Sequence, residues 1–187
     1  IRQGIEGEDK DMDEVTLIIR LLQDNWSSSA AALVSAGTIT ASHNATPKFI
    51  DIRSIEPQEG RRVDIDSESV IIVFEDSSAT SYPTIDYAAR NEDFSFTLHL
   101  RVLHRRDMTS NTFSRDRLEA LYKIVRYIFE NNAFRPTVYA TPADNTSAAL
   151  GDADLVRLTS RNEANDRGKR LLGYKIGVEL KRFARAT

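Results

Sequence analysis

An alternation of apolar and polar residues from Phe94 to Val102 restricts the fold more than any other feature of the chain. In an extended strand every second side chain points the same way, so this segment has one apolar face and one polar face. The segment from Leu172 to Leu180 repeats the pattern. Each segment therefore predicts a strand with one buried face, and together they predict a sheet that packs on a core from one side.

Two amphipathic helices are predicted to cover that side of the sheet. The first runs from about Asp11 to Trp26, where apolar residues recur at helical spacing and Asp11 and Glu14 have the spacing of a capping box. The three serines at 27–29 are expected to end it. The second runs from Ser114, a predicted N-cap, to Asn131, with an apolar stripe along its length.

Further strands are predicted from shorter apolar runs. Val70 to Phe74 is continuously apolar and rich in β-branched residues, which indicates a strand buried on both faces and placed in the middle of the sheet. Phe49–Ile55 and Asp154–Thr159 are weaker candidates. Runs of strands with two helices, rather than strict strand–helix alternation, indicate an α+β fold with a mainly antiparallel sheet and both helices on one face.

The length of 187 residues suits one domain with one core. We expect that domain to span residues 1–187, with its core in 11–26 and 49–185. Three polar segments, 27–48, 75–92 and 134–153, are expected to be extended loops or arms. Because the chain has no cysteine, it has no disulfide, no thiolate metal site and no cysteine nucleophile. No long apolar run predicts a membrane span, and the first ten residues do not resemble a signal peptide.

Charge is distributed unevenly along the chain. Residues 1–90 contain 16 acidic and 8 basic residues, a net charge of −8, whereas residues 91–187 contain 12 acidic and 17 basic residues, a net charge of +5. Two differently solvated surfaces of one monomer would account for this difference. A subunit that docks its basic flank on the acidic flank of a neighbour would account for it too.

Motifs that carry catalytic or cofactor chemistry are missing, so no catalytic, cofactor-binding or metal-ligating residue is predicted. No glycine-rich phosphate loop and no GxSxG sequence occurs. His43 is expected in a loop, and His99 and His104 on opposite faces of a strand, which does not suit a metal pair. Asp64 and Asp66 would share one strand face but lie beside two arginines, which favours solvated charges over a cation site.

Basic residues cluster in the second half of the chain. Direct sequence-specific binding of nucleic acid is not expected, because the chain is acidic overall, with a pI of about 5.7. The alternatives are a surface that meets an acidic neighbour and a surface that guides passing DNA without specific contact. The candidate residues for such a surface are Arg101, Arg105, Arg106, Arg115, Arg117, Arg161, Arg167, Lys169 and Arg170.

The order of these segments resembles that of the tail terminator and tail-completion proteins of tailed viruses. The resemblance rests on an N-terminal amphipathic helix, the apolar strand 70–74, an acidic connection, the strand DFSFTLHLRVL at 93–103, the helix RDRLEALYKIVRYIF at 115–129 and the final strand GYKIGVELK at 173–181. It implies a hexameric ring that caps the tail tube and meets the neck or connector proteins in the virion, after assembly in the host cytoplasm. Oppositely charged flanks suit the head-to-tail contact of a ring.

The resemblance implies a structural protein rather than an enzyme. Its partners would be further copies of itself, the tail tube protein and the neck, connector or portal-adaptor proteins, with passing DNA in the lumen and no membrane. The polar arms depart from the compact members of the family, so another neck component, such as a head-closure, connector or tube protein, is an alternative. A small metal-dependent enzyme that uses Asp64 and Asp66 or His99 is a third hypothesis.

Overall fold

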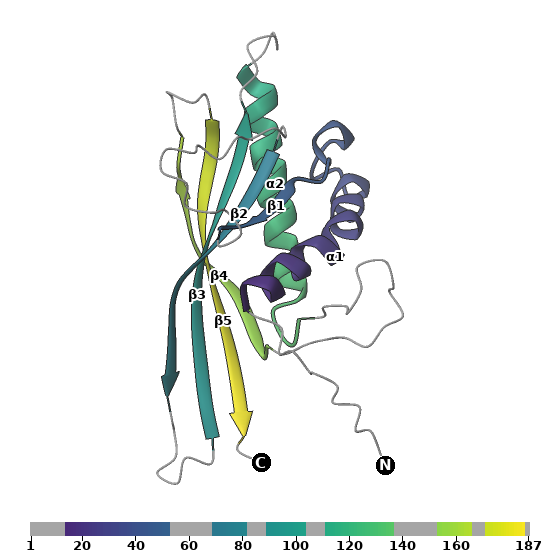
Figure 1. Ribbon diagram of the computed structural model, residues 1–187. Helices are drawn as coiled ribbons and strands as arrows, with labels where there is room; N and C mark the ends of the chain where they lie inside the picture. The colour runs from purple at the N-terminus through teal and green to yellow at the C-terminus, as the bar shows by residue number, and fades with distance from the viewer. Residues whose placement is uncertain are drawn as a thin grey trace, which may run out of the picture.

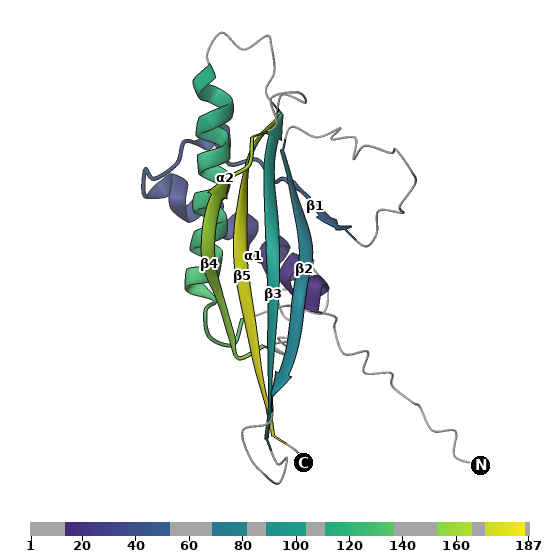
Figure 2. The same ribbon diagram turned by 90° about the vertical axis from the view of Figure 1, so that its left-hand side faces the viewer.

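The structure is a computed structural model, and it describes residues 14–52, 69–81, 89–103, 111–136, 153–165 and 171–185. These residues form a five-stranded sheet with two long helices on one face (Figures 1 and 2). Neighbouring strands are antiparallel, except that the first two run parallel. The α+β class and the mainly antiparallel sheet are therefore confirmed. The strands lie in the order β1-β2-β3-β5-β4, with β1 at Lys48–Asp51, β2 at Ser69–Ser81, β3 at Ala89–Leu103, β4 at Leu155–Glu163 and β5 at Leu171–Arg185.

The two alternating segments form the centre of the sheet, as β3 and β5. They pair with each other along their whole length, from Leu103 opposite Leu171 to Phe94 opposite Leu180 and beyond. Their apolar faces point toward the helices, and the buried residues there are at most 7% exposed. These residues are Phe96, Leu98, Leu100, Val102, Tyr174, Ile176, Val178 and Leu180.

The apolar run at Val70 to Phe74 begins β2 rather than the middle strand. Val70 to Val73 are buried on both faces of the sheet, as predicted. However, β3 holds the central place, and β2 lies between it and the short parallel strand β1. The predicted connection at 75–92 is also wrong at both ends, because β2 continues to Ser81 and β3 begins at Ala89.

Helix α1, at Glu14–Ser35, is longer than predicted. The serines at 27–29 do not end it, because its buried stripe continues through Ser29, Ala30 and Leu33. The helix ends instead at Ser35, and Gly37, two residues later, has a φ of 66°, the left-handed conformation that glycine adopts easily. The N–H groups of Gly37 and Thr38 donate to the carbonyls of Val34 and Leu33, the pattern of a Schellman motif.

Residues after α1 also differ from the predicted loop at 27–48. A short 3₁₀-helix, η1, at Ala41–His43 follows the end of α1, and His43 is buried there. Trp26 of α1 meets Phe49 of β1 edge to face, with ring centroids 5.6 Å apart. This aromatic contact attaches the helix to the outer strand of the sheet.

Helix α2, at Asn111–Asn131, ends where predicted but begins three residues before the predicted N-cap. Ser114 therefore lies inside the first turn, where it is buried. The apolar stripe from Leu118 to Phe129 packs on β3 and β5. No helix in the described part of the chain is long and apolar enough to cross a membrane.

Three strands extend beyond the layer of helices at one end of the molecule (Figure 1). The projecting part comprises the second half of β2, the start of β3 and the end of β5; β3 pairs with both of the others, and its register with β2 shifts between Glu75 and Ser77. From Glu75 to Ser81, every side chain of β2 is exposed. Among the described residues, the sheet therefore has a covered part, packed on α1 and α2, and a projecting part that extends past the helices and meets α1 at its first residue, Glu14.

Some predictions fall on residues outside the described ranges. These are the start of the first helix at Asp11, the end of the predicted strand 49–55, the pair Asp64 and Asp66, and most of the arm 134–153. The strand predicted at 154–159 is confirmed and continues to Glu163 as β4.

Candidate functional site

The structure separates the basic residues that cluster in the sequence. Among the nine candidates, the side chains of Arg101, Arg115, Arg117 and Arg161 are described, and each has different surroundings. Arg115 is exposed on α2, whereas Arg117, two residues later, is only 4% exposed. The described residues therefore do not form one basic surface. The other five candidates, Arg105, Arg106, Arg167, Lys169 and Arg170, lie outside the described ranges.

Arg117 links α2 to the beginning of β2. Its Nη2 donates to the Ser69 hydroxyl at 3.1 Å, and both residues are buried. A buried guanidinium requires hydrogen-bond partners, because its desolvation is costly. Arg117 therefore acts within the subunit as a tie between helix and sheet, and it is not available to DNA or to a neighbouring copy.

Arg161 on β4 lies in the most organised charged cluster of the described residues. Its guanidinium carbon is 4.0 Å from the ring centroids of both Tyr122 and Tyr174, so two aromatic rings contact the cation. Its two terminal nitrogens donate to the carboxylate of Glu119 at 3.3 and 2.7 Å. The Tyr174 hydroxyl donates to the same carboxylate at 3.0 Å.

The electrostatics of this cluster follow from its geometry. Partial burial lowers the pKa of Arg161, but the hydrogen bond and charge of Glu119 outweigh that effect and raise the pKa above its ordinary value. Burial and the negative charge of Glu119 raise the pKa of the Tyr174 hydroxyl. Arg161 is therefore charged and the Tyr174 hydroxyl protonated at neutral pH, and the cluster fastens β4 and β5 to α2.

Arg101 points to the helix-free face of the sheet, together with His99. Its Nη2 lies 3.4 Å from His99 Nδ1, and the His99 ring packs on Phe74 of β2, with centroids 4.3 Å apart. Burial, reinforced by the charges of Arg101 and Lys175, lowers the pKa of His99 to about 4. His99 is therefore neutral at physiological pH.

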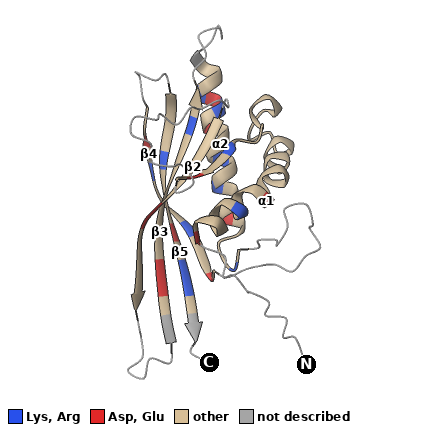
Figure 3. Cartoon of the chain, viewed as in Figure 1, with Lys and Arg blue, Asp and Glu red and all other residues tan. Residues whose placement is uncertain are grey.

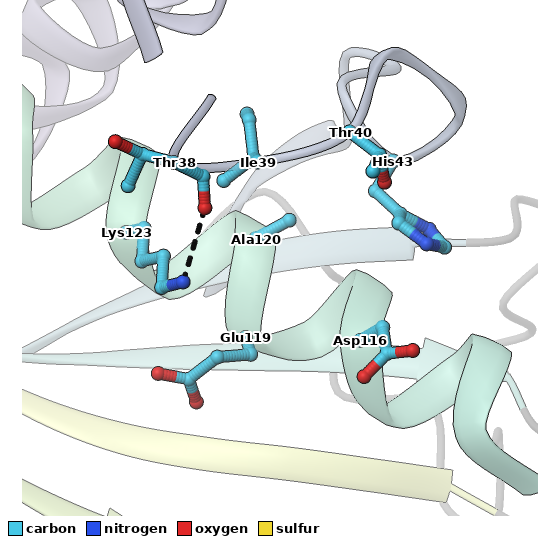
Figure 4. Close-up of a pocket in the computed structure, with 8 residues that line it drawn as sticks. All are labelled: Thr38, Ile39, Thr40, His43, Asp116, Glu119, Ala120 and Lys123. Atoms are coloured by element: carbon cyan, nitrogen blue, oxygen red, sulfur yellow. Dashed lines mark hydrogen bonds between the residues drawn. The ribbon is translucent and has the colours of Figure 1, made fainter. Parts of the chain in front are cut away.

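A shallow pocket of about 290 Å³ lies between the segment after α1 and helix α2 (Figure 4). Lys123 reaches across it and donates to the backbone oxygen of Thr38 at 3.1 Å. His43 lines it opposite Asp116 and Glu119, and the His43 ring packs on Phe113 with centroids 4.6 Å apart. The pocket thus brings a histidine and two carboxylates to one place.

These pocket residues do not converge as metal ligands. Nowhere in the described ranges do three or more His, Cys, Asp or Glu side chains come together in a way that could hold a metal ion. Glu119 is already bound to Arg161, and the Nδ1 atom of His43 is shut off from solvent without a hydrogen-bond partner. The geometry supports a packing contact between the 38–43 segment and α2 rather than a reaction centre.

A second groove, of about 320 Å³, lies between α2 and the edge strand β4. Its lining is mainly apolar, and an exposed ion pair between Arg126 and Glu130, 2.6 Å long, lies on its helix side. No pattern in the sequence predicts this groove, because its two walls are some thirty residues apart in the chain. The lining residues are Tyr122, Arg126, Phe129, Glu130, Ala133, Val156, Arg157 and Leu158.

Sequence reasoning also missed two exposed aromatic residues and the partners of Arg161. Phe134 is 80% exposed and Phe183 is 55% exposed. Phe183 follows Lys181 and Arg182 and shares the odd-numbered register of Glu179 and Lys181, so the alternation of β5 already indicated that its ring lies on the polar face. The pairing of Arg161 with Glu119 joins residues 42 positions apart, for which a single sequence contains no signal.

Comparison with known proteins does not identify the chain: no protein-family model matches it, and neither does any curated protein.

Proposed function

We propose that this protein is a ring-forming structural subunit of the neck of a tailed virus, a tail terminator that caps the tail tube and joins it to the connector. One observation supports the proposal most. In the described part of the chain, helices cover one face of the sheet only, and three strands continue past these helices as a polar projection (Figure 1). Such a subunit has a helix-free face, which is buried at Val70 and Ile72 but exposed over β4, and in its described part an unpaired edge of β2 and a projecting end. These surfaces are suited to contacts with neighbours.

The exposed part of the helix-free face suits the wall of a channel. Over β4 and β5 it carries exposed polar or charged side chains, including Arg157, Ser160, Asn162 and Lys175. A polar surface with basic groups tolerates the passage of a phosphate backbone without binding one sequence. In a ring, we expect Arg101 and Lys175 to face the lumen, whereas Arg117 and Arg161 are engaged inside the subunit.

The projection suits a contact with a second type of protein. The β2 edge from Glu75 to Ser81 has no strand beside it among the described residues, since β1 pairs only with residues 70–73. Its side chains are small or acidic, which keeps an exposed edge from aggregating while its backbone groups can still pair with a partner.

The test combines the purified protein with tail tubes assembled from the tube protein of the same virus. Mass photometry of the protein alone should show a closed oligomer of about six copies, the stoichiometry that the resemblance implies. Electron microscopy of the mixture should show a ring at one end of each tube. A protein that stays monomeric and leaves tube ends bare would contradict the proposal, and a ring found in the virion away from the last tube ring would assign it to another neck position.

A further inference from the structure

Two glycines of β5 leave room on the helix-free face for side chains of the neighbouring strands. The core residues of β5 are even-numbered, so Gly173, Lys175 and Gly177 lie on the opposite, helix-free face. A Cβ atom on Gly177 would collide with the hydroxyl oxygens of Thr159 and Ser160, which stand where the register of β4 shifts. Glycine at this position therefore lets both hydroxyls lie over β5.

Arg101 of β3 lies over the other glycine. Its Cγ is 3.7 Å from the position that a Cβ on Gly173 would take, and its Nη2 is 3.4 Å from His99 Nδ1. His99 is directly opposite Lys175 in the sheet. Burial and the charges of Arg101 and Lys175 lower its pKa to about 4, so the ring is neutral at physiological pH. With Nδ1 accepting from Arg101, the ring proton is on Nε2, which makes His99 a donor as well.

Hydrogen-bond donors from three neighbouring strands thus gather on this face. Asn162 of β4, exposed and opposite Lys175, adds an amide. Arginine, lysine, serine, threonine and asparagine are the side chains that contact phosphate oxygens in complexes of proteins with DNA. We call this set the donor cluster, and its members are Arg101, His99, Lys175, Thr159, Ser160 and Asn162.

Carboxylates nearby on the same face are already bound. Asp76 of β2 accepts from the Thr97 hydroxyl at 2.6 Å, and Glu179 of β5 binds two cations, at 2.5 and 3.2 Å. In contrast, Arg101 and Lys175 form no ion pair with any carboxylate among the described residues. Two cations without a counter-charge favour the binding of an anion between them.

The extent of the donor cluster indicates a ligand longer than one phosphate group. Arg101 is opposite Gly173 and Ser160 is opposite Gly177, so they are four residues apart along β5 and on different sides of it. From strand spacings, their backbone positions are about 13 Å apart along the strands and about 10 Å apart across them. Each strand of duplex DNA carries one phosphate per about 3.4 Å of helix axis, so its backbone can engage both ends of the cluster.

We propose that the donor cluster binds the phosphate backbone of duplex DNA. This inference rests on the proposed function, which assigns the helix-free face to the channel, and it names the ligand of that face and the residues that hold it. Arg101 and Lys175 neutralise phosphate charge, while the hydroxyls, the amide and the imidazole position the backbone. Because no base edge is read, binding is independent of sequence and weakens with salt, so DNA can move past the site.

The test measures the affinity for a labelled duplex of about 20 base pairs by fluorescence anisotropy between about 50 and 200 mM salt. The wild type should bind two unrelated duplexes equally, with a micromolar Kd at low salt. Arg101→Gln with Lys175→Gln should weaken binding at least about tenfold and reduce the salt slope by about 2, about one for each lost phosphate contact. The matched control, Arg115→Gln with Arg126→Gln, removes two exposed charges from α2 on the other face and should leave the slope unchanged.

A further variant keeps the charge and removes only the hydroxyls. Thr159→Val with Ser160→Ala should weaken binding by about three- to tenfold, the range for lost hydrogen bonds, without changing the salt slope. Circular dichroism checks that every variant is folded. Loss of affinity at constant slope distinguishes a defined site from the general attraction of DNA to a positive surface.

Competition identifies the source of the anion. At constant ionic strength, inorganic phosphate should displace DNA no more than chloride does, and polyglutamate should not compete. Displacement by inorganic phosphate would indicate a single-phosphate site, and competition by polyglutamate would indicate a surface for an acidic protein; either result overturns the inference. A wild type that does not bind DNA at about 50 mM salt overturns it too, as does an equal loss of affinity in the cluster variant and the α2 control.

The two proposals fail separately. A protein that binds DNA through the donor cluster but never forms a ring on a tail tube loses only the proposed function. A protein that forms such rings, but whose variant at Arg101 and Lys175 binds DNA like the wild type, loses only this inference.

Discussion

The covered part and the projecting part of the sheet are continuous in backbone but are stabilised in different ways. In the covered part, β3 and β5 bury apolar side chains against α1 and α2, and residues such as Phe96 and Leu98 are fully buried. In the projecting part, acidic residues of β3 lie beside basic residues of β5 (Figure 3). Arg182 binds Glu92 and Glu14 at 3.2 Å each, and Lys181 binds Asp93 at the same distance.

This difference indicates which part is fixed and which can adapt. Apolar burial is insensitive to salt, whereas ion pairs between partly exposed groups weaken as ionic strength rises. The covered part thus maintains the fold of the subunit. The projecting part should open locally at a lower cost than the covered part, because exposed backbone hydrogen bonds and few apolar contacts give low local stability.

The largest effect is expected from a cavity in the covered part. Phe96→Ala removes a fully buried ring at the centre of the sheet, and should lower the free energy of unfolding by about 3–5 kcal/mol. Ser78→Ala, at an exposed position of β2, should change it by less than about 0.5 kcal/mol. Urea denaturation of both variants measures the difference, and equal values would show that the two parts are not stabilised differently.

The covered part could be predicted from sequence, and the projecting part could not, for a physical reason. Burial on one face imposes the alternation seen from Phe94 to Val102, which is readable in the chain. The strand from Glu75 to Ser81 is exposed on both faces, so nothing imposes a pattern on its side chains. Only its pairing with residues 91–96 of β3 makes it a strand.

The end of helix α1 and the positions of the basic residues also could not be predicted from the sequence, because both depend on packing. Ser29 is buried in a helix that continues for six more residues, because the packing of Ala30 and Leu33 outweighs the weak helix propensity of serine. Arg115 and Arg117 are two residues apart and were grouped, yet one is exposed and the other buried, since residues two apart lie on different sides of a helix. Neighbours in sequence are thus poor evidence for a shared site.

A second prediction concerns the ion pairs of the projecting part. Arg182→Met leaves the carboxylates of Glu14 and Glu92 without their shared cation in a setting where they are 21% and 12% exposed. The expected loss is about 1.5–3 kcal/mol, typical for hydrogen bonds to charged groups. Hydrogen exchange should show the loss of protection first in β3 residues 91–93, with the covered strands unchanged.

Two controls distinguish ion pairing from general destabilisation. Arg126→Met, which breaks an exposed pair on α2, should leave these exchange rates unaltered. High salt should reduce the difference between the wild type and the Arg182 variant. If both halves of the sheet lose protection together, the ion pairs do not act locally.

A third prediction uses pH to test the helix-free face of the covered part. Burial and the charges of Arg101 and Lys175 lower the pKa of His99 from 6.5 to about 4, and Asp76 opposes this only weakly. The unfolded chain therefore binds a proton that the folded protein resists, so stability falls as pH drops from about 6.5 to about 4. Because the ring is only half-buried, solvent screening limits the effect to about 1–2 kcal/mol.

The measurement is urea denaturation across that pH range, with His99→Gln as the comparison. On acidification the variant should lose about 1–2 kcal/mol less stability than the wild type, because glutamine at position 99 does not titrate. Identical slopes in the two proteins would mean that His99 is accessible and titrates normally.

The smallest change in stability is expected for the ion pair between Arg161 and Glu119, because the covered part is stabilised mainly by its apolar core. Arg161→Met removes the cation between Tyr122 and Tyr174 and the two hydrogen bonds to Glu119, and its side chain is 34% exposed. The expected loss of stability is about 0.5–1 kcal/mol, the value of an exposed cation–π contact.

Arg161 also lowers the pKa of Tyr174 against the larger raising effects of burial and Glu119. The variant should therefore show a Tyr174 pKa higher than in the wild type, by spectrophotometric titration with Tyr174→Phe to assign the signal. A Tyr174 pKa that falls, or stays unchanged, would mean that the guanidinium does not lie between the two rings in solution.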